Sequence, residues 1–145
     1  MDYLNIKLEA SDNKSYSLAD FSGKKIVLYF YPKDNTSGCT IEAKDFTCLQ
    51  DDFAKKGYQI IGVSKDSVKS HQNFISKQEL NLLLLSDIDT ELIQAFDVWK
   101  EKSMYGKKYM GVERSTFILD EAGKVIKEYR KVSSSKHAET VLSEL

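Results

Sequence analysis

Hydrophobic residues gather along the chain in short runs that predict a series of strands. The longest apolar and aromatic run, residues 26–31, suits a central strand buried on both faces and stops at Pro32. Alternation in the first ten residues, followed by turn residues at 11–14, predicts a small N-terminal hairpin. A second hairpin is expected around the turn at residues 120–123. The remaining predicted strands are residues 58–64, 82–85, 115–119 and 124–129.

A helical period of apolar residues separates several of these strands. The predicted helices run from Cys39 to about Lys56 with Gly57 closing the helix, over residues 68–78, over residues 90–96 with Asp89 as the N-cap, and over residues 134–145. This order of elements predicts one three-layer α/β domain over residues 1–145, with a central mixed sheet flanked by helices. No repeat or linker divides the chain, and its glycines form no phosphate-binding motif.

Composition and charge narrow the class of protein. The 145 residues carry 21 Lys plus Arg and 22 Asp plus Glu, so the formal net charge of −1 gives no reason to expect a nucleic-acid or membrane partner. The first residues lack the apolar run of a signal peptide, and the leucines at 82–85 are too few to span a bilayer, so we expect a cytoplasmic protein. Two cysteines are too few for a disulfide scaffold or a four-thiolate zinc site.

Cys39 occupies a position that favours a reactive thiol. It follows a buried-type strand, a short polar loop and a glycine, and it opens the predicted helix. Unpaired N–H groups and the helix dipole favour an anion there, so a thiolate is stabilised. Thr36 stands close enough in sequence to bring a hydroxyl beside the sulfur, and Pro32 fixes the backbone at the strand exit. The plainer alternative is a small apolar residue packed in a turn.

Arginine is rare in this lysine-rich chain. Only Arg114 and Arg130 are present, and Arg114 stands at the entrance of the apolar strand 115–119. An arginine there is usually a solvated edge charge, but its forked guanidinium is also suited to holding an anion. If strand 115–119 lies beside the strand that ends at Pro32, Arg114 can reach the sulfur of Cys39.

Residues 29–43, YFYPKDNTSGCTIEA, contain the pattern P-x-x-x-T-x-x-C and resemble the active-site signature of the peroxiredoxins. The segments VWKEKSMYGK at 98–107 and RSTF at 114–117 also resemble the bacterioferritin comigratory protein, or peroxiredoxin Q, branch of that family. The resemblance covers nearly the whole chain. It implies a thioredoxin-like fold and thiol-dependent reduction of hydrogen peroxide and organic hydroperoxides, with no metal or organic cofactor.

The resemblance also assigns roles to matching residues. Cys39 is expected to be the peroxidatic cysteine, whose thiolate attacks the peroxide O–O bond and becomes a sulfenic acid. Thr36 is expected to hydrogen-bond the peroxide and the sulfur, Arg114 to hold the thiolate, and Pro32 to shield it from water. The expected partners are a hydroperoxide and thioredoxin or another thiol reductant, acting on a monomer or weak dimer.

Two positions depart from the family pattern. Ser37 stands where proline is usual, and Lys44 occupies the position, five residues after Cys39, where many members of the branch have their resolving cysteine. Cys48 is predicted to project from the same face as Lys44, one turn further along and away from the apolar stripe.

The distance between the two cysteines argues against a direct bond. In an intact helix they lie roughly 13 Å apart along the axis, whereas a disulfide needs Cα atoms within about 7 Å. We therefore favour single-cysteine turnover with an external thiol, and keep Cys48 as the alternative resolving residue. Two other functions stay open: a disulfide oxidoreductase using Cys39 and Cys48, which the absence of C-x-x-C disfavours, and a non-enzymatic redox sensor.

Other residues have simpler interpretations. His71 and His137 lie in polar, helix-like segments and are expected at the surface. Trp99 and Tyr105 are expected to pack in the core or a pocket wall. A group of lysines is expected to form a solvated face: Lys100, Lys102, Lys107 and Lys108.

Overall fold

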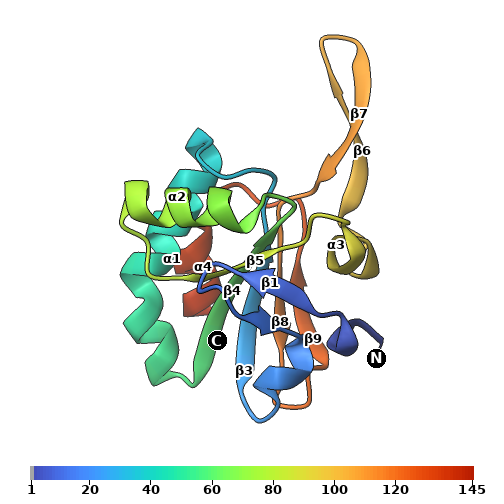
Figure 1. The fold of residues 1–145 in the computed structure, drawn as a ribbon. Coiled ribbons are helices and arrows are strands. Elements are labelled where there is room, and N and C mark those ends of the chain that lie inside the picture. The colour runs from blue at the N-terminus through green and yellow to red at the C-terminus, as the bar shows by residue number, and fades with distance from the viewer. Residues whose placement is uncertain (1) are drawn as a thin grey trace.

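A computed structural model describes residues 2–145 as a layered α/β domain (Figure 1). Its main sheet has seven strands in the order β2-β1-β5-β4-β3-β8-β9. β3, β4 and β5 are mutually parallel, and the other neighbours are antiparallel, so the sheet is mixed as predicted. The strands are β1 (Leu8–Ala10), β2 (Ser15–Tyr16), β3 (Lys25–Phe30), β4 (Tyr58–Ser64), β5 (Leu83–Ser86), β8 (Ser115–Leu119) and β9 (Val125–Tyr129).

The central strand β3 separates two hydrophobic clusters. Alternate residues of a strand point to opposite faces, so Ile26, Leu28 and Phe30 enter one cluster, and Val27 and Tyr29 enter the other. Every residue from 26 to 31 is buried, which confirms the prediction of a strand covered on both faces. β3 lies between β4 and β8, so its C-terminal end lies within the sheet and not at a lateral edge.

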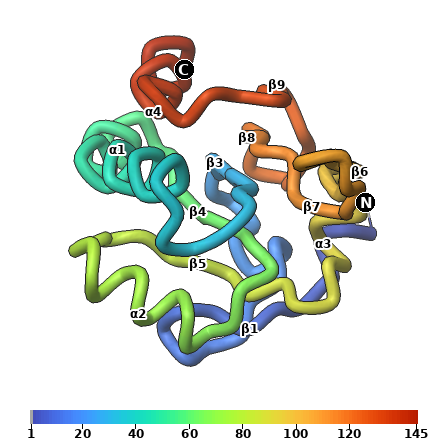
Figure 2. Tube along the Cα trace, turned by 90° about the horizontal axis from the view of Figure 1, so that it is seen from above, coloured from blue at the N-terminus to red at the C-terminus, as the bar shows by residue number. Residues whose placement is uncertain are grey.

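Helices cover both faces of this sheet, as Figure 2 shows from above. α1 (Ser37–Lys55), α2 (Val68–Gln78) and α4 (His137–Ser143) lie on the face of Tyr29. The short α3 (Glu91–Ala95) and the 3-10 turns Asp2–Asn5 and Leu18–Phe21 lie on the other face. The three-layer arrangement is thus confirmed. None of the helices within residues 2–145 has both the length and the hydropathy to span a membrane.

A separate two-stranded hairpin projects from the domain (Figure 1). It consists of β6 (Trp99–Met104) and β7 (Lys107–Val112), and the pattern of apolar residues did not predict it. Its two-residue turn has φ of 52° at Tyr105 and 78° at Gly106, the conformation in which asparagine before glycine is the usual signal. Tyr105 is 98% exposed, so its predicted place in the core or a pocket wall is wrong. Trp99 does pack against the first cluster.

The start of α3 differs from the prediction. Thr90, with φ of 58°, is the N-cap, and Asp89 is exposed. Asp87 supplies the carboxylate instead, because its Oδ2 accepts a hydrogen bond from the backbone N–H of Ile93 at 2.7 Å. The carboxylate at the start of α3 therefore comes from Asp87, two residues before the predicted N-cap Asp89.

Candidate active site

Cys39 lies in the first turn of α1, just after the loop that connects β3 to this helix. The helix begins at Ser37, two residues earlier than predicted, and Thr36 is its N-cap. Cys39 is 2% exposed and packs in the same cluster as Tyr29 and Phe46. Backbone N–H groups of the first helical turn have no acceptor within the helix, so the sulfur sits at a position that favours negative charge.

Arg114 brings a fixed positive charge to the sulfur. Its Nη2 donates a hydrogen bond to Cys39 Sγ at 3.3 Å. The contact arises because β8, which begins at Ser115, pairs antiparallel with β3, so that Ser115 lies opposite Phe30. The adjacency of these two strands, on which the sequence-based hypothesis about Arg114 depended, is therefore present.

Glu42 completes the surroundings of Arg114, and its part was missed in the sequence. Its Oε1 accepts a hydrogen bond from Arg114 Nη1 at 2.7 Å, and its side chain is wholly buried. Burial raises the pKa of Glu42 from 4.5 to about 7, although Arg114 acts in the opposite direction. The other carboxylate oxygen, Oε2, and the buried hydroxyl of Tyr29 make no hydrogen bond among the described residues. In the sequence, the sign that Glu42 belongs to the site was its position three residues after Cys39, on the same face of the helix.

Gly38 leaves the space through which Arg114 approaches. A Cβ atom at residue 38 would lie 3.2 Å from Arg114 Nη2 and 3.3 Å from Ser134 Oγ, closer than ordinary packing allows. Pro32, half-buried, follows β3 directly and begins the loop that leads to α1. A rigid residue and a small one thus stand at the two ends of the segment that leads from β3 to Cys39.

The side chain of Thr36 has a different hydrogen-bond partner from the one expected. Its Oγ1 donates to the carbonyl oxygen of Lys33 at 2.8 Å rather than to the sulfur of Cys39. Its own carbonyl oxygen accepts from Thr40 N at 2.9 Å. The hydroxyl oxygen keeps its lone pairs, so it can still accept a hydrogen bond from a ligand that carries an O–H group.

Cys48 lies on the outer side of α1, as predicted. It is exposed, like Lys44 one turn before it, whereas Phe46 and Phe53 are buried. α1 is continuous between Cys39 and Cys48, so the two residues are roughly 13 Å apart along the helix axis. The structure therefore brings Cys39 and Arg114 together but leaves Cys48 outside the site.

Asp34 fastens the loop between β3 and α1 to α2. Its Oδ2 lies 2.7 Å from His71 Nδ1 and accepts from Ser70 Oγ at 2.8 Å, while its Oδ1 accepts from Tyr31 OH at 2.6 Å. His71 Nε2 lies 2.9 Å from the carbonyl oxygen of Leu85, so both ring nitrogens face acceptors. His71 is fully buried, which makes the prediction of a surface histidine wrong.

His137 is also buried, contrary to expectation. Its Nε2 lies 2.7 Å from Thr116 Oγ1, and its ring packs edge-on against Phe46 and Tyr129. Burial, together with the charge of Arg114, lowers the pKa of His137 from 6.5 to about 4. The ring is therefore neutral at neutral pH and adds no charge beside Arg114. Both histidines are buried because each meets a polar partner that is distant in sequence.

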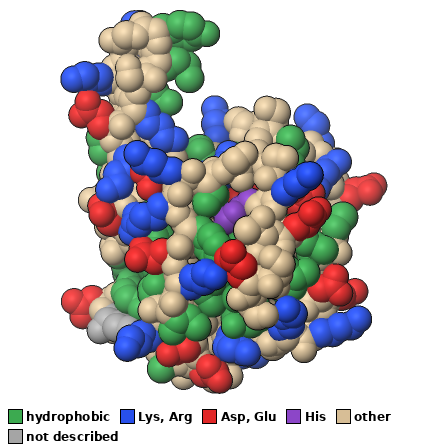
Figure 3. Space-filling view, turned by 180° about the vertical axis from the view of Figure 1, so that it is seen from behind, with side chains coloured by type: hydrophobic (Ala, Val, Ile, Leu, Met, Phe, Trp, Pro, Cys, Tyr) green, Lys and Arg blue, Asp and Glu red, His purple; other side chains and the backbone are tan. Residues whose placement is uncertain are grey.

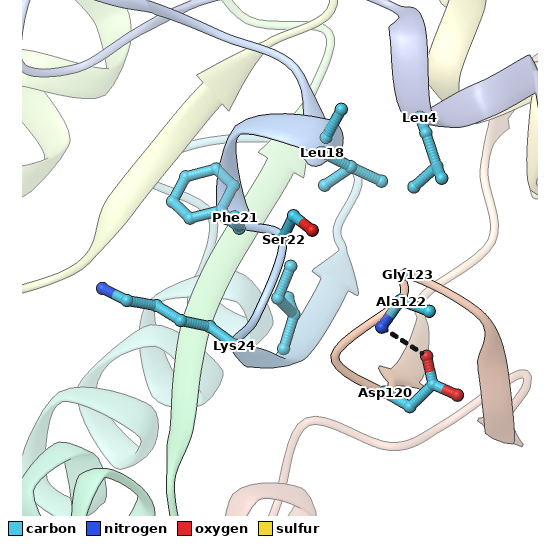
Figure 4. A pocket seen from close by; sticks show the side chains of 10 residues that line it. Leu4, Leu18, Phe21, Ser22, Lys24, Asp120, Ala122 and Gly123 are labelled. Atoms are coloured by element: carbon cyan, nitrogen blue, oxygen red, sulfur yellow. Dashed lines mark hydrogen bonds between the residues drawn. The ribbon is translucent and has the colours of Figure 1, made fainter.

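A small, mostly apolar pocket lies at the other end of β3 and is not part of this site. Figure 4 shows its walls, which come from the N-terminal segment, the 3-10 turn Leu18–Phe21, the start of β3 and the turn after β8. Ile26 lines it at the N-terminal end of β3, whereas Cys39 follows the C-terminal end. Neither cysteine lines the pocket; its lining residues are Leu4, Leu18, Ala19, Phe21, Ser22, Lys24, Ile26, Asp120, Ala122 and Gly123.

The fold and the site together define a class of protein. A nearly buried cysteine at a helix N-terminus, held by a guanidinium, is arranged to act as a thiolate nucleophile. Fixed donors around the sulfur suit a reaction in which negative charge develops on a leaving oxygen. These are the features of a thiol-dependent peroxidase on an α/β domain.

Comparison with known proteins agrees with this class. The AhpC/TSA family model matches residues 2–128. Peroxiredoxin Bcp of Xanthomonas campestris is 49% identical over 141 residues, which are 97% of this chain and 88% of that protein. Peroxiredoxin Bcp of Bacillus subtilis is 48% identical, covering 97% of this chain and 90% of that protein.

A solved structure gives the same result. The bacterioferritin comigratory protein of X. campestris, studied for its alkyl peroxide reduction activity, matches with a TM-score of 0.93 and 47% identity, covering 98% of this chain and 90% of that one. The chain therefore belongs to the AhpC/TSA family, in the Bcp and peroxiredoxin Q group. The predictions of a thioredoxin-like fold and of a thiol-dependent peroxidase are confirmed, and the disulfide oxidoreductase and sensor alternatives are not favoured.

Proposed function

We propose that Cys39 is the residue that reduces the peroxide. Its thiolate attacks one oxygen of the hydroperoxide, an S–O bond forms, and the O–O bond breaks. The sulfur is oxidised by two electrons to sulfenic acid, and the other oxygen leaves as an alkoxide or hydroxide that takes up a proton. The hydrogen bond from Arg114 to the sulfur at 3.3 Å is the observation that carries this proposal.

The neighbouring groups have complementary parts in the same step. Arg114 stabilises the thiolate before attack and the charge on the peroxide oxygens during it. Thr36 accepts a hydrogen bond from the hydroperoxide O–H, and the first-turn N–H groups of α1 supply further donors. Pro32 limits the access of water to the sulfur. Support comes from Thr36, which is the N-cap of α1, and from Arg114, which contacts Cys39 in the first turn of that helix.

Regeneration is assigned to an external thiol, with thioredoxin as the reductant. That thiol attacks the sulfenic acid, releases water and forms a mixed disulfide, which a second thiol of the reductant then resolves. The separation of Cys39 and Cys48 along a continuous helix supports this route over an internal disulfide. Because the reaction consumes a protein thiol, a reducing compartment such as the cytoplasm fits it.

The substrate range proposed is hydrogen peroxide together with alkyl hydroperoxides. Support for the alkyl substrates comes from the relative of known alkyl peroxide reduction activity, which is 47% identical to this chain. For the state of assembly we propose a monomer or weak dimer, which sedimentation at several concentrations tests.

Peroxide consumption tests the proposal directly. Purified protein is supplied with hydrogen peroxide or an alkyl hydroperoxide and with dithiothreitol or thioredoxin as the donor. The wild-type protein and Cys48→Ser are expected to turn over, whereas Cys39→Ser is expected to be inactive. Unchanged turnover in Cys39→Ser would remove Cys39 from the reaction.

A further inference from the structure

The β6–β7 hairpin stands clear of the domain and carries a mixture of lysines and apolar side chains (Figure 3). Met104 is 56% exposed, Tyr109 is 44% exposed and Tyr105 at the tip is almost fully exposed. Apolar side chains of this size, grouped on a projecting element, are characteristic of a surface that is covered by a partner.

The cross-strand register divides the hairpin into two faces that differ in charge, although exposed apolar residues occur on both, with Met110 on the second. Residues directly opposite each other share a face, so Lys102 with Tyr109 and Met104 with Lys107 form one of them, here called the site-side face. It contains two lysines and two exposed apolar residues but no acid. On the opposite face Lys108 is balanced by Glu101, with Nζ and Oε1 3.6 Å apart.

The site-side face adjoins the active site. The stem of Lys102 crosses Gly111, where a Cβ atom would lie 3.2 Å from Lys102 Cδ. β7 ends at Val112, two residues before Arg114, and Arg114 Nη2 contacts Cys39 Sγ, so the base of the hairpin lies beside the active site. Burial, together with the charge of Arg114, also lowers the pKa of Lys102. A protein thiol that reaches Cys39 beside Arg114 therefore meets the hairpin.

The tip adds an independent sign of function. Tyr105 has a left-handed backbone conformation that bulky residues rarely adopt, and its side chain lies in solvent outside the hydrophobic core. Asparagine suits this turn position better. Tyr105 is unfavourable for the hairpin turn and is exposed, which suggests that its side chain contacts a partner protein.

We propose that residues 102–109 dock the protein thiol reductant that regenerates Cys39, and that this reductant presents acidic and apolar side chains around its own thiol. The inference rests on the proposed function, because it needs an external thiol donor. Unpaired lysines steer an acidic partner, while Met104, Tyr105 and Tyr109 supply the apolar contact area. Cys39 is 2% exposed, so a protein thiol must be held beside this site while the sulfur becomes accessible.

Two variants and a matched control test the docking surface. Lys107→Glu reverses a charge on the site-side face, and Lys108→Glu makes the same change on the opposite face. Tyr105→Asn removes the apolar tip but gives the turn its preferred residue, so it does not weaken the hairpin. For each variant, kcat/KM is measured for thioredoxin, varied at fixed hydroperoxide, and separately for dithiothreitol.

The proposal expects kcat/KM for thioredoxin to fall about fivefold or more in Lys107→Glu and Tyr105→Asn, and to change less than about twofold in Lys108→Glu. The dithiothreitol values stay at the wild-type level in all three. Equal losses with Lys107→Glu and Lys108→Glu, or no loss with either Lys107→Glu or Tyr105→Asn, would overturn the docking surface. Wild-type turnover with dithiothreitol but not with thioredoxin would also overturn the docking surface, while leaving the peroxidase function intact. Inactivity of wild type with every donor would instead contradict the proposed function.

Discussion

Arg114 and Glu42 form a buried ion pair at 2.7 Å, and the same guanidinium hydrogen-bonds the sulfur of Cys39. A planar, forked cation can contact two anionic groups at once through different nitrogens, which an ammonium group cannot do with the same geometry. The carboxylate thereby fixes the orientation of the group that faces the sulfur of Cys39. The site consequently depends on two residues of one helix and one residue at the start of a strand.

Replacing Arg114 by lysine keeps the charge but removes the fork. We expect the second-order rate constant for peroxide reduction to fall about 100-fold, the usual loss when one fixed donor to developing negative charge is removed. Stopped-flow measurement of peroxide reduction gives this constant. Arg130→Lys is the matched control, because Arg130 donates to the carbonyl oxygens of Phe96 and Asp97. Equal rate constants for the two variants would contradict the role of Arg114.

Glu42 should make stability depend on pH in a defined direction. Its pKa is about 7 in the folded protein, compared with 4.5 ordinarily, so the folded state holds the proton over that interval. Stability is therefore lost as pH rises from about 4.5 to about 7, by roughly 3 kcal/mol in total. Glu42→Gln lacks this titration.

Urea unfolding of Glu42→Gln and wild type at about pH 5 and about pH 8 checks the effect. The free energy of unfolding of the variant, relative to wild type, should increase between the two pH values. Other titrating groups, His137 included, are present in both proteins and cancel in this difference. A difference that does not change with pH would show that Glu42 ionises normally.

The pair of Asp34 and His71 should matter for stability. His71→Ala leaves the buried carboxylate of Asp34 without its partner at 2.7 Å, and we expect a loss of about 3 kcal/mol in the free energy of unfolding. Asp34→Asn in the same chain removes the buried charge that His71 faces, so the double variant should lose less than the sum of the two single variants. Strict additivity would mean that the two residues do not stabilise each other.

Cys48 should be dispensable for turnover. Cys48→Ser is expected to keep kcat with thioredoxin within about twofold of wild type, because an intact helix holds the two sulfurs too far apart to bond. The steady-state rate and a non-reducing gel after peroxide treatment provide the measurement. A large loss of thioredoxin-dependent turnover would show instead that α1 unwinds and that Cys48 resolves the sulfenic acid.

Much of the fold follows from the sequence because apolar residues repeat with the periods of strands and helices. The run at 26–31 is fully buried, and β4, α2 and β8 have the predicted bounds. The hairpin β6–β7 was missed because its strands are largely polar and its turn contains Tyr105 where asparagine is usual.

The site is harder to predict because its contacts join residues that are distant in sequence. Arg114 meets Cys39 only because β8 and β3 are neighbours in the sheet. Glu42 follows Cys39 by three residues, but this spacing alone does not show that its side chain is buried against Arg114. The same reason explains His71, whose partner Asp34 lies on a different element.

Intact mass spectrometry after one equivalent of hydroperoxide tests the central role of Cys39 most directly. The wild-type protein and Cys48→Ser are expected to gain about 16 Da, with peptide mapping placing the oxygen on Cys39, and Cys39→Ser is expected to gain nothing. An oxygen placed on Cys48, or the same gain in Cys39→Ser, would contradict the assignment of Cys39 as the residue that reduces the peroxide.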